Sequence, residues 1–179
     1  MSKSEFNNRA TIEKMIKANK KLSTEQLDNF GDDKDVVLYA ISHSSYDILS
    51  ATEALTNDKD FMMKALDIVP VKHKSMVFSC AGEDAAKDTE LFLKALKSSD
   101  ATNGYLIVKG ADENAIFKDP QRFKEALSVI QTSNWKEDHK TQITDAMFLN
   151  LHDPDLIKEM SAFRNDALSR PPSKAPKPR

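Results

Sequence analysis

The residues best suited to catalysis are a single cysteine and the histidine nearest to it. Cys80 is the only cysteine in the chain, and His73 precedes it by seven residues. An activated thiol needs a base within hydrogen-bonding reach. On one helix, seven residues correspond to roughly 10 Å, at about 1.5 Å of rise per residue. This distance is too long for a contact between the Cys80 thiol and the His73 imidazole within one helix. Cys80 also stands among Met76, Val77 and Ala81, so we expect a thiol packed in the core.

Metal and phosphate chemistry have no recognisable motif. The histidines at 43, 73, 139 and 152 show no His-x-x-x-His spacing, and a Cys-x-x-Cys pair is absent. The four glycines lie too far apart to form a phosphate-binding loop. We therefore expect no catalytic residues, no metal and no cofactor, with a Cys80-dependent enzyme as the alternative.

A helix-start motif recurs along the chain and organises it. An aspartate is followed by apolar residues at offsets 3, 4, 7 and 8, most often with alanine at offset 7. The five copies begin at Asp33, Asp58, Asp88, Asp119 and Asp153, spaced 25 to 34 residues apart. Such a period is typical of repeat arrays. The fourth copy places Arg122 in one of the apolar positions.

Each copy has the features of a capped amphipathic helix. The aspartate can accept hydrogen bonds from the unpaired N–H groups of the first turn, and Pro120 and Pro154 follow it where a missing N–H costs nothing. The apolar offsets form one stripe of helical period. We expect these stripes to be buried. The expected core positions are Val37, Ile41, Met62, Leu66, Phe92, Leu96, Phe123, Leu127 and Ile157.

The pattern predicts an all-α fold, a short α-solenoid or helical-repeat bundle made of antiparallel helical hairpins. The helix that completes each hairpin is expected over residues 46–55 in the first unit and about 137–150 in the last. Residues 105–108 form a short run that also suits a strand, but the repeat context favours a helix. The scarcity of glycine argues against a β-rich fold.

Three regions are predicted. Residues 1–30 form N-terminal capping helices, with Ser23 and Gln26 as a capping box and lysines on the outer side. Residues 31–168 form the helical-repeat domain. Residues 169–179 form a disordered, basic, proline-rich tail, which we interpret as a linker in preference to a basic binding arm.

Charge and composition limit the partners. The net charge is −2, and the last ten residues hold four cations and no anion, so the preceding body carries −6. This acidic body argues against nucleic acid as the main partner. The lone cysteine suits a reducing, cytoplasmic compartment, and no apolar run is long enough for a transmembrane helix. Binding of nucleic acid or an anionic membrane through the tail remains a second alternative.

The segment Asp33–Leu66 resembles a bacterial repeat family of unknown function. The family's units read D-K-E-V-V-L-x-A-V, then A-S-E-x-L, then D-K-E again 25 residues on. Here the corresponding residues are Asp33-Lys34-Asp35-Val36-Val37-Leu38, Ala51-Thr52-Glu53 and Asp58-Lys59-Asp60. The departures are Ser44-Ser45, where the family has an Asn-Gly turn, and Thr52, where it has Ser. The resemblance implies tandem α-hairpins without catalytic residues. It also implies an interaction scaffold or an effector of bacteria that live inside other cells.

The sequence therefore favours a non-catalytic module that binds a protein partner, a bacterial effector or its regulator. A helical array aligns its turns along one edge, where binding residues commonly lie. The candidate partner-binding residues are Trp135, Tyr46, His43, His73 and Lys74. Trp135, the only tryptophan, either packs the end of the core or anchors an interface.

Overall fold

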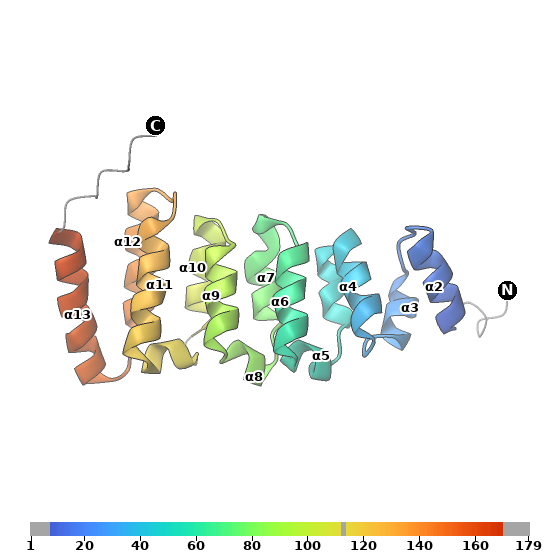
Figure 1. Ribbon diagram of the computed structural model, residues 1–179, viewed down its shortest axis with the longest axis horizontal. Coiled ribbons are helices and arrows are strands. Elements are labelled where there is room, and N and C mark those ends of the chain that lie inside the picture. Colours follow the sequence, from blue (N-terminus) through green and yellow to red (C-terminus); the bar gives the residue numbers. More distant parts are fainter. Residues whose placement is uncertain (1–7, 112–113, 170–179) are drawn as a thin grey trace, which may run out of the picture.

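The computed structural model describes residues 8–111 and 114–169, and its regular elements are all helical. No strand occurs in these ranges, which confirms the predicted all-α class. The helices stand side by side in an elongated row, with α2 at one end and α13 at the other (Figure 1). Residues 105–108, the ambiguous run, lie inside a helix. Of the predicted tail over residues 169–179, Ser169 is the last residue of a helix, and residues 170–179 lie outside the described residues.

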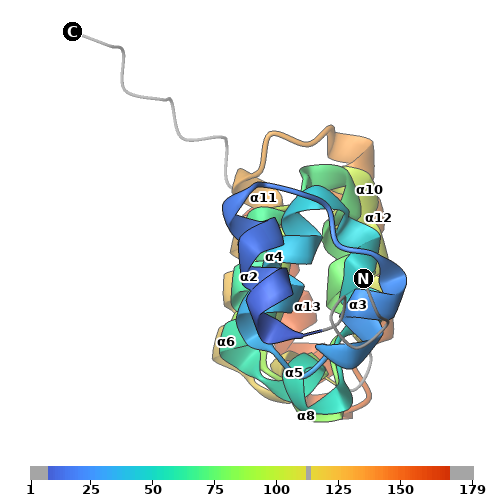
Figure 2. The same ribbon diagram turned by 90° about the vertical axis from the view of Figure 1, so that its right-hand side faces the viewer.

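The row has two layers and an edge (Figure 2). The first layer contains α2 (Arg9–Lys17), α4 (Lys34–His43), α6 (Lys59–Ile68), α9 (Thr89–Lys97), α11 (Pro120–Thr132) and α13 (Pro154–Ser169). The second contains α3 (Thr24–Asn29), the 3-10 helices η1 (Ser45–Ser50) and η2 (Val71–His73), α7 (Lys74–Ser79), α10 (Ala101–Lys109) and α12 (Glu137–Leu149). Three short elements follow the edge: α5 (Glu53–Asn57), α8 (Glu83–Ala86) and η3 (Ala115–Lys118).

All five aspartates of the motif cap their helices as predicted. Asp58 Oδ1 accepts from the N–H of Phe61 at 3.1 Å, and Asp88 Oδ1 accepts from the N–H of Leu91 at 2.9 Å. Asp33, Asp119 and Asp153 each accept from two N–H groups of the first turn. Pro120 and Pro154 are the first residues of their helices. The predicted capping box of Ser23 and Gln26 is also present. The aspartate period therefore sets where every first-layer helix from α4 onward begins.

The two leading apolar offsets of the motif face opposite neighbours. Val36, at offset 3, belongs to an N-terminal core cluster with Ile12 and Leu27, whereas Val37, at offset 4, belongs to the main core. Offset 3 therefore points to the preceding unit and offset 4 to the following one. Both clusters meet at α4, so the helices of residues 9–29 cover the first unit's outer side.

One predicted core residue is exposed. Ile157 stands at offset 4 of the last copy and is 38% exposed, whereas Leu156 at offset 3 is buried. The prediction was wrong at Ile157 because α13 is the last described helix, so the flank that faces a following unit has no neighbour. The other expected core residues are all buried.

Each unit pairs a first-layer helix with second-layer elements, but the helix predicted over residues 46–55 was wrong in its form. The expected helix over residues 46–55 is a 3-10 helix, an extended break and the separate α5. The break occurs because the N–H of Thr52 donates to the carbonyl of Gly31 at 2.9 Å instead of continuing the helix. The later helix, expected over about 137–150, is confirmed as α12.

Neighbouring units are joined by backbone hydrogen bonds along the α5–α8–η3 edge. The N–H groups of Gly82 and Ala115 donate to the carbonyls of Thr56 and Lys87 at 2.9 and 3.2 Å, which repeats the Thr52 contact one and two units later. A Cβ at Gly31 would lie 2.3 Å from the carbonyl oxygen of Ser50. Only glycine permits this close approach.

Aromatic rings continue the packing from unit to unit. Ring centroids lie 6.1 Å apart between Phe78 and Phe92, between Phe92 and Phe117 and between Phe117 and Phe123, and 5.5 Å apart between Phe123 and Phe148. All four contacts are edge-to-face, a favoured geometry for aromatic pairs. The core is thus one chain of contacts running along the array.

Leu96→Ala should lower the free energy of unfolding by roughly 2 to 5 kcal/mol, because Leu96 is fully buried between units. Leu106→Ala is the matched control, since Leu106 is 49% exposed on the adjacent helix, and should cost well under half as much. Urea unfolding monitored by circular dichroism measures both. Equal losses in the two variants would contradict the packing described here.

Candidate functional site

Large apolar side chains are exposed on the second layer in every unit. They are Tyr46 and Leu49 in η1, Val71 in η2, Leu106 in α10 and Leu149 in α12, with exposed fractions from 48% to 79%. We call these five residues the second-layer row. Two other large apolar residues, Ile68 and Ile157, are exposed in the first layer, at about 40%. Single exposed apolar residues are ordinary, but a set that recurs unit by unit in one layer is a candidate binding face.

Two predicted partner-binding residues contact each other, and one of them, Tyr46, belongs to this row. The rings of Tyr46 and His73 lie 5.5 Å apart, centroid to centroid, tilted by 56°. This contact connects η1 to η2. His73 Nδ1 is buried and has no hydrogen-bond partner among the described residues, so packing against Tyr46 holds the imidazole in place. Tyr46 itself is 61% exposed.

His43 is engaged within the chain. Its ring lies 4.5 Å from that of Tyr39, Nδ1 is 3.1 Å from the Tyr39 carbonyl oxygen, and Nε2 is 3.2 Å from Oδ1 of Asn19. Both ring nitrogens therefore face acceptors on α4 and on the loop after α2. The contact fixes the capping helix α2 to the first unit, and the imidazole remains at the surface.

Lys74 is buried, which differs from its expected place on an exposed turn. Its side chain lies below the surface, and Nζ donates to the carbonyl oxygen of Leu66 in the last turn of α6. Burial lowers the pKa of this ammonium, since the charged form loses hydration. Lys74 thus ties α7 to α6, while Lys72 beside it is exposed.

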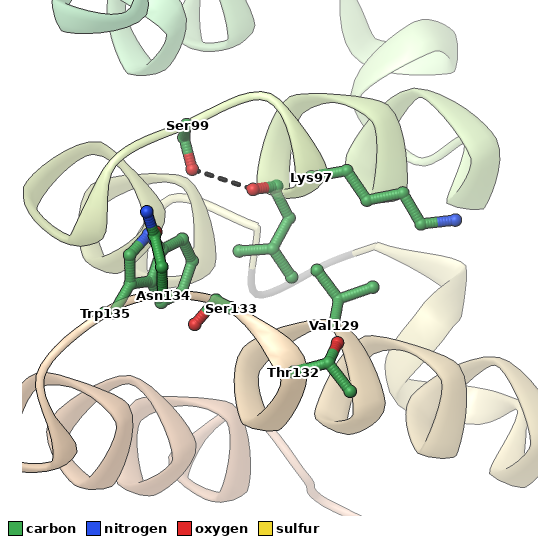
Figure 3. A pocket seen from close by; sticks show the side chains of 8 residues that line it. Lys97, Ser99, Val129, Thr132, Ser133, Asn134 and Trp135 are labelled. Atoms are coloured by element: carbon green, nitrogen blue, oxygen red, sulfur yellow. Dashed lines mark hydrogen bonds between the residues drawn. The ribbon is translucent and has the colours of Figure 1, made fainter. Parts of the chain in front are cut away.

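Trp135 borders a pocket at the edge of the array opposite to α5, α8 and η3 (Figure 3). Its indole ring covers Gly104 of α10 so closely that a Cβ there would lie 2.7 Å from Cη2. The pocket is about 300 Å³ in volume and lies between the ends of α9 and α11. Its lining consists of Leu96, Lys97, Ser99, Val129, Thr132, Ser133, Asn134 and Trp135. Trp135 therefore both packs on the core and faces a cavity.

The first layer carries ion pairs between units. Lys34 Nζ lies 2.8 Å from Asp58 Oδ2, and Lys59 Nζ lies 3.1 Å from Asp88 Oδ2. In both cases the cation follows one cap aspartate and reaches the cap of the next unit. Further pairs between first-layer helices are Lys59–Glu90, Lys94–Asp67, Lys97–Glu125 and Lys124–Glu159. The charges of this face are largely matched within the array, in contrast to the apolar second-layer row.

Arg122, the cation in an apolar position of the motif, has a local partner. Its Nη1 lies 3.0 Å from Oε2 of Glu125, whose Oε1 lies 3.1 Å from Nζ of Lys97 in the preceding unit. The hydrogen bond from Lys97, followed by that from Arg122, holds the pKa of the Glu125 carboxyl below its usual value. This trio takes the place of an apolar contact at offset 3.

Cys80 has the surroundings of a core thiol. It is partly buried against the main core at the end of α7. Burial raises the pKa of the thiol, which disfavours the reactive thiolate. Within the described ranges, no cluster of three or more His, Cys, Asp and Glu side chains could hold a metal ion. No described helix combines the length and hydropathy needed to span a bilayer.

The fold and its repeated contacts define the class as a helical-repeat array. Residues 33–84 match the family model described as a domain of unknown function, DUF4116. The match runs from the cap aspartate of α4 into α8, so it includes the segment Asp33–Leu66 that carries the family resemblance. Comparisons with curated proteins and with solved structures found no match.

Sequence reasoning missed Leu49, Leu106 and Leu149 as surface residues. Leu49 was expected inside an α-helix, but the tighter 3-10 helix buries Ile48 and turns Leu49 outward. Leu149 lies off the stripe formed by the buried Ile143, Ala146 and Met147. A leucine that lies off the apolar stripe of its helix was the sequence signal that could have predicted an exposed position.

The Lys34–Asp58 pair should couple the first two units in a pH-dependent way. The hydrogen bond from Lys34, followed by that from the Phe61 N–H, lowers the pKa of Asp58. A lowered folded-state pKa stabilises above the unfolded value of about 3.9, and this contribution is lost as the pH falls through the folded value. A double-mutant cycle of Lys34→Met and Asp58→Asn should give a coupling of about 0.5 kcal/mol at pH 7 that declines below about pH 4.

Urea unfolding of the four proteins measures this coupling. The control cycle combines Asp58→Asn with Lys64→Met, because Lys64 is an exposed lysine farther along α6. A coupling that is independent of pH, or equal in the control cycle, would show that the ion pair does not join the units.

Cys80 should react slowly with a disulfide reagent such as Ellman's reagent. At pH 8 the folded protein should react about tenfold or more slowly than the protein unfolded in urea, because burial disfavours the thiolate. The release of the coloured thiol, followed by absorbance, gives both rates. A folded-state rate above the unfolded one would instead support the alternative hypothesis of a Cys80-dependent enzyme.

Proposed function

We propose that this protein is a non-catalytic helical-repeat scaffold that binds a protein partner along its second-layer face. The observation that carries the proposal is the second-layer row, in which each of four successive units exposes at least one large apolar side chain. Stacked repeats commonly present extended binding surfaces of this kind. A partner that follows the array would cover one such contact per unit.

The distribution of charge supports the same face. First-layer cations and carboxylates are paired across units, so a partner there would have to compete with existing ion pairs. On the second layer, the partner would instead remove apolar surface from water, the dominant favourable term in association. Tyr46 is the strongest anchor candidate, since tyrosine is enriched among the residues that carry binding energy.

The biological setting is part of the proposal. The resemblance of residues 33–66 to repeats of intracellular bacteria supports a bacterial effector, or a regulator of one. The match to DUF4116 includes the same residues and carries no function of its own. The lone Cys80 suits a reducing cytoplasm, that of the producing cell or of a host.

Acidic substitutions in the row should weaken partner binding. A partner recovered with the array from the lysate of the producing organism or its host is purified and titrated by calorimetry. Leu49→Glu and Leu149→Glu should each raise the dissociation constant about tenfold or more, which is 1.4 kcal/mol. Both residues are more than 70% exposed, so the fold should be preserved.

Ala162→Glu is the matched control, because Ala162 is an exposed apolar residue of the first-layer helix α13. It should leave the affinity unchanged. Wild-type affinity in both leucine variants, or equal weakening in the control, would reject the second-layer face.

A further inference from the structure

The three hydroxyl groups of the pocket beside Trp135 offer acceptors and not donors. The Ser99 and Ser133 hydroxyls donate to the carbonyls of Leu96 and Ile130 at 2.9 and 2.6 Å. The Thr132 hydroxyl donates to the Ser128 carbonyl at 2.7 Å. Each hydroxyl has only one hydrogen, so only lone pairs are left for a ligand. Three of the pocket's polar side chains therefore favour a ligand that donates hydrogen bonds.

Two helix ends add negative potential to the same place. α9 ends at Lys97 and α11 ends at Thr132, and both residues line the pocket. Each helix carries about half a negative elementary charge at its C-terminus. The two carboxyl ends converge on one cavity and favour a cation there, although Lys140 Nζ already offsets part of the α11 end by donating to the Gln131 carbonyl.

Trp135 supplies an aromatic wall, and two lysines oppose a bound cation. One is Lys97 in the lining, and the other is Lys140, whose Nζ donates to the Gln131 carbonyl in the last turn of α11 at 3.0 Å. The indole is the aromatic group that attracts cations best. Lys97 is the only charged residue in the lining, and its ammonium is paired with Glu125 at 3.1 Å. Figure 3 shows this ammonium on the side of the pocket opposite to Trp135, pointing away from the indole. Lys140 is paired with Glu137 at 3.0 Å, so both ammonium groups have carboxylate partners outside the lining.

We propose that this pocket binds the guanidinium group of an arginine side chain. A guanidinium is planar, stacks on aromatic rings and offers five donors without an acceptor, which matches an indole wall and hydroxyl lone pairs. A cavity of about 300 Å³ accommodates a single long side chain. The arginine would come from the partner of the proposed function, and only this source rests on that function. The pocket's chemistry can be tested without any partner.

Trp135 is the chain's single tryptophan, so its emission reports on the pocket directly. The folded full-length protein is titrated with N-acetyl-arginine amide, and with N-acetyl-citrulline amide as a neutral analogue of nearly the same shape, at constant ionic strength. We expect a saturable change with the arginine compound and about tenfold weaker binding of the citrulline compound. N-acetyl-glutamate amide should produce no change.

Two substitutions test the assignment of charge and acceptor. Lys97→Gln removes the only cation of the lining and should tighten arginine amide binding about threefold, because a like charge is lost. Lys64→Gln, the same change on α6 away from the pocket, should have no effect. Thr132→Val removes one acceptor at an exposed position and should weaken binding, with circular dichroism confirming the fold.

Equal binding of the arginine and citrulline amides, weaker binding in Lys97→Gln, or preference for the glutamate compound would each overturn a guanidinium site. An absence of any emission change would overturn it too. If arginine amide binds as expected while the leucine variants retain partner affinity, the pocket stands and the proposed second-layer face fails.

Discussion

The structure depends on apolar contacts between neighbouring units. On α4, offset 3 faces back and offset 4 faces forward, since Val36 and Val37 belong to different clusters, and on α13 the forward-facing Ile157 is exposed while Leu156 is buried. A unit therefore cannot bury its own stripe, and its stability comes from its neighbours. The edge-to-face phenylalanines and the backbone hydrogen bonds of the α5–α8–η3 edge repeat the same dependence in the core and at the surface.

This dependence assigns different tasks to the faces of the array. Cap aspartates on the first layer begin one unit's helix and bind the cation of the preceding unit, as Asp58 does with Lys34. The charged side chains of that face are therefore largely occupied by contacts between units. The second layer has shorter elements, and side chains such as Leu49 and Leu149 are left outside the core. The Trp135 pocket lies at the opposite edge, where α9 and α11 end. One wall of it is the indole ring, which packs on Gly104 of α10.

Local physics made most of the fold predictable and little of the surface. Capping and the 3.6-residue stripe depend on nearby residues, so the five helix starts and all but one expected core position are confirmed. The break at Thr52 depends on a hydrogen bond to Gly31 some twenty residues away, which no local pattern encodes. The burial of Lys74 against Leu66 and the exposure of Ile157 are likewise set by which units are adjacent. Candidate site residues inherit this limit, since exposure is decided by neighbours.

The most direct test of the account is whether damage at one end of the array reaches the other. Ile41→Ala empties a buried site in the first unit, while Trp135 reports on the loop before α12. Urea unfolding is followed by tryptophan emission and by circular dichroism in the wild type and in the variant. If neighbouring units stabilise one another, the emission midpoint should shift to lower urea together with the circular dichroism midpoint. A tryptophan transition that stays at its wild-type midpoint would show that the units fold independently and would contradict the account.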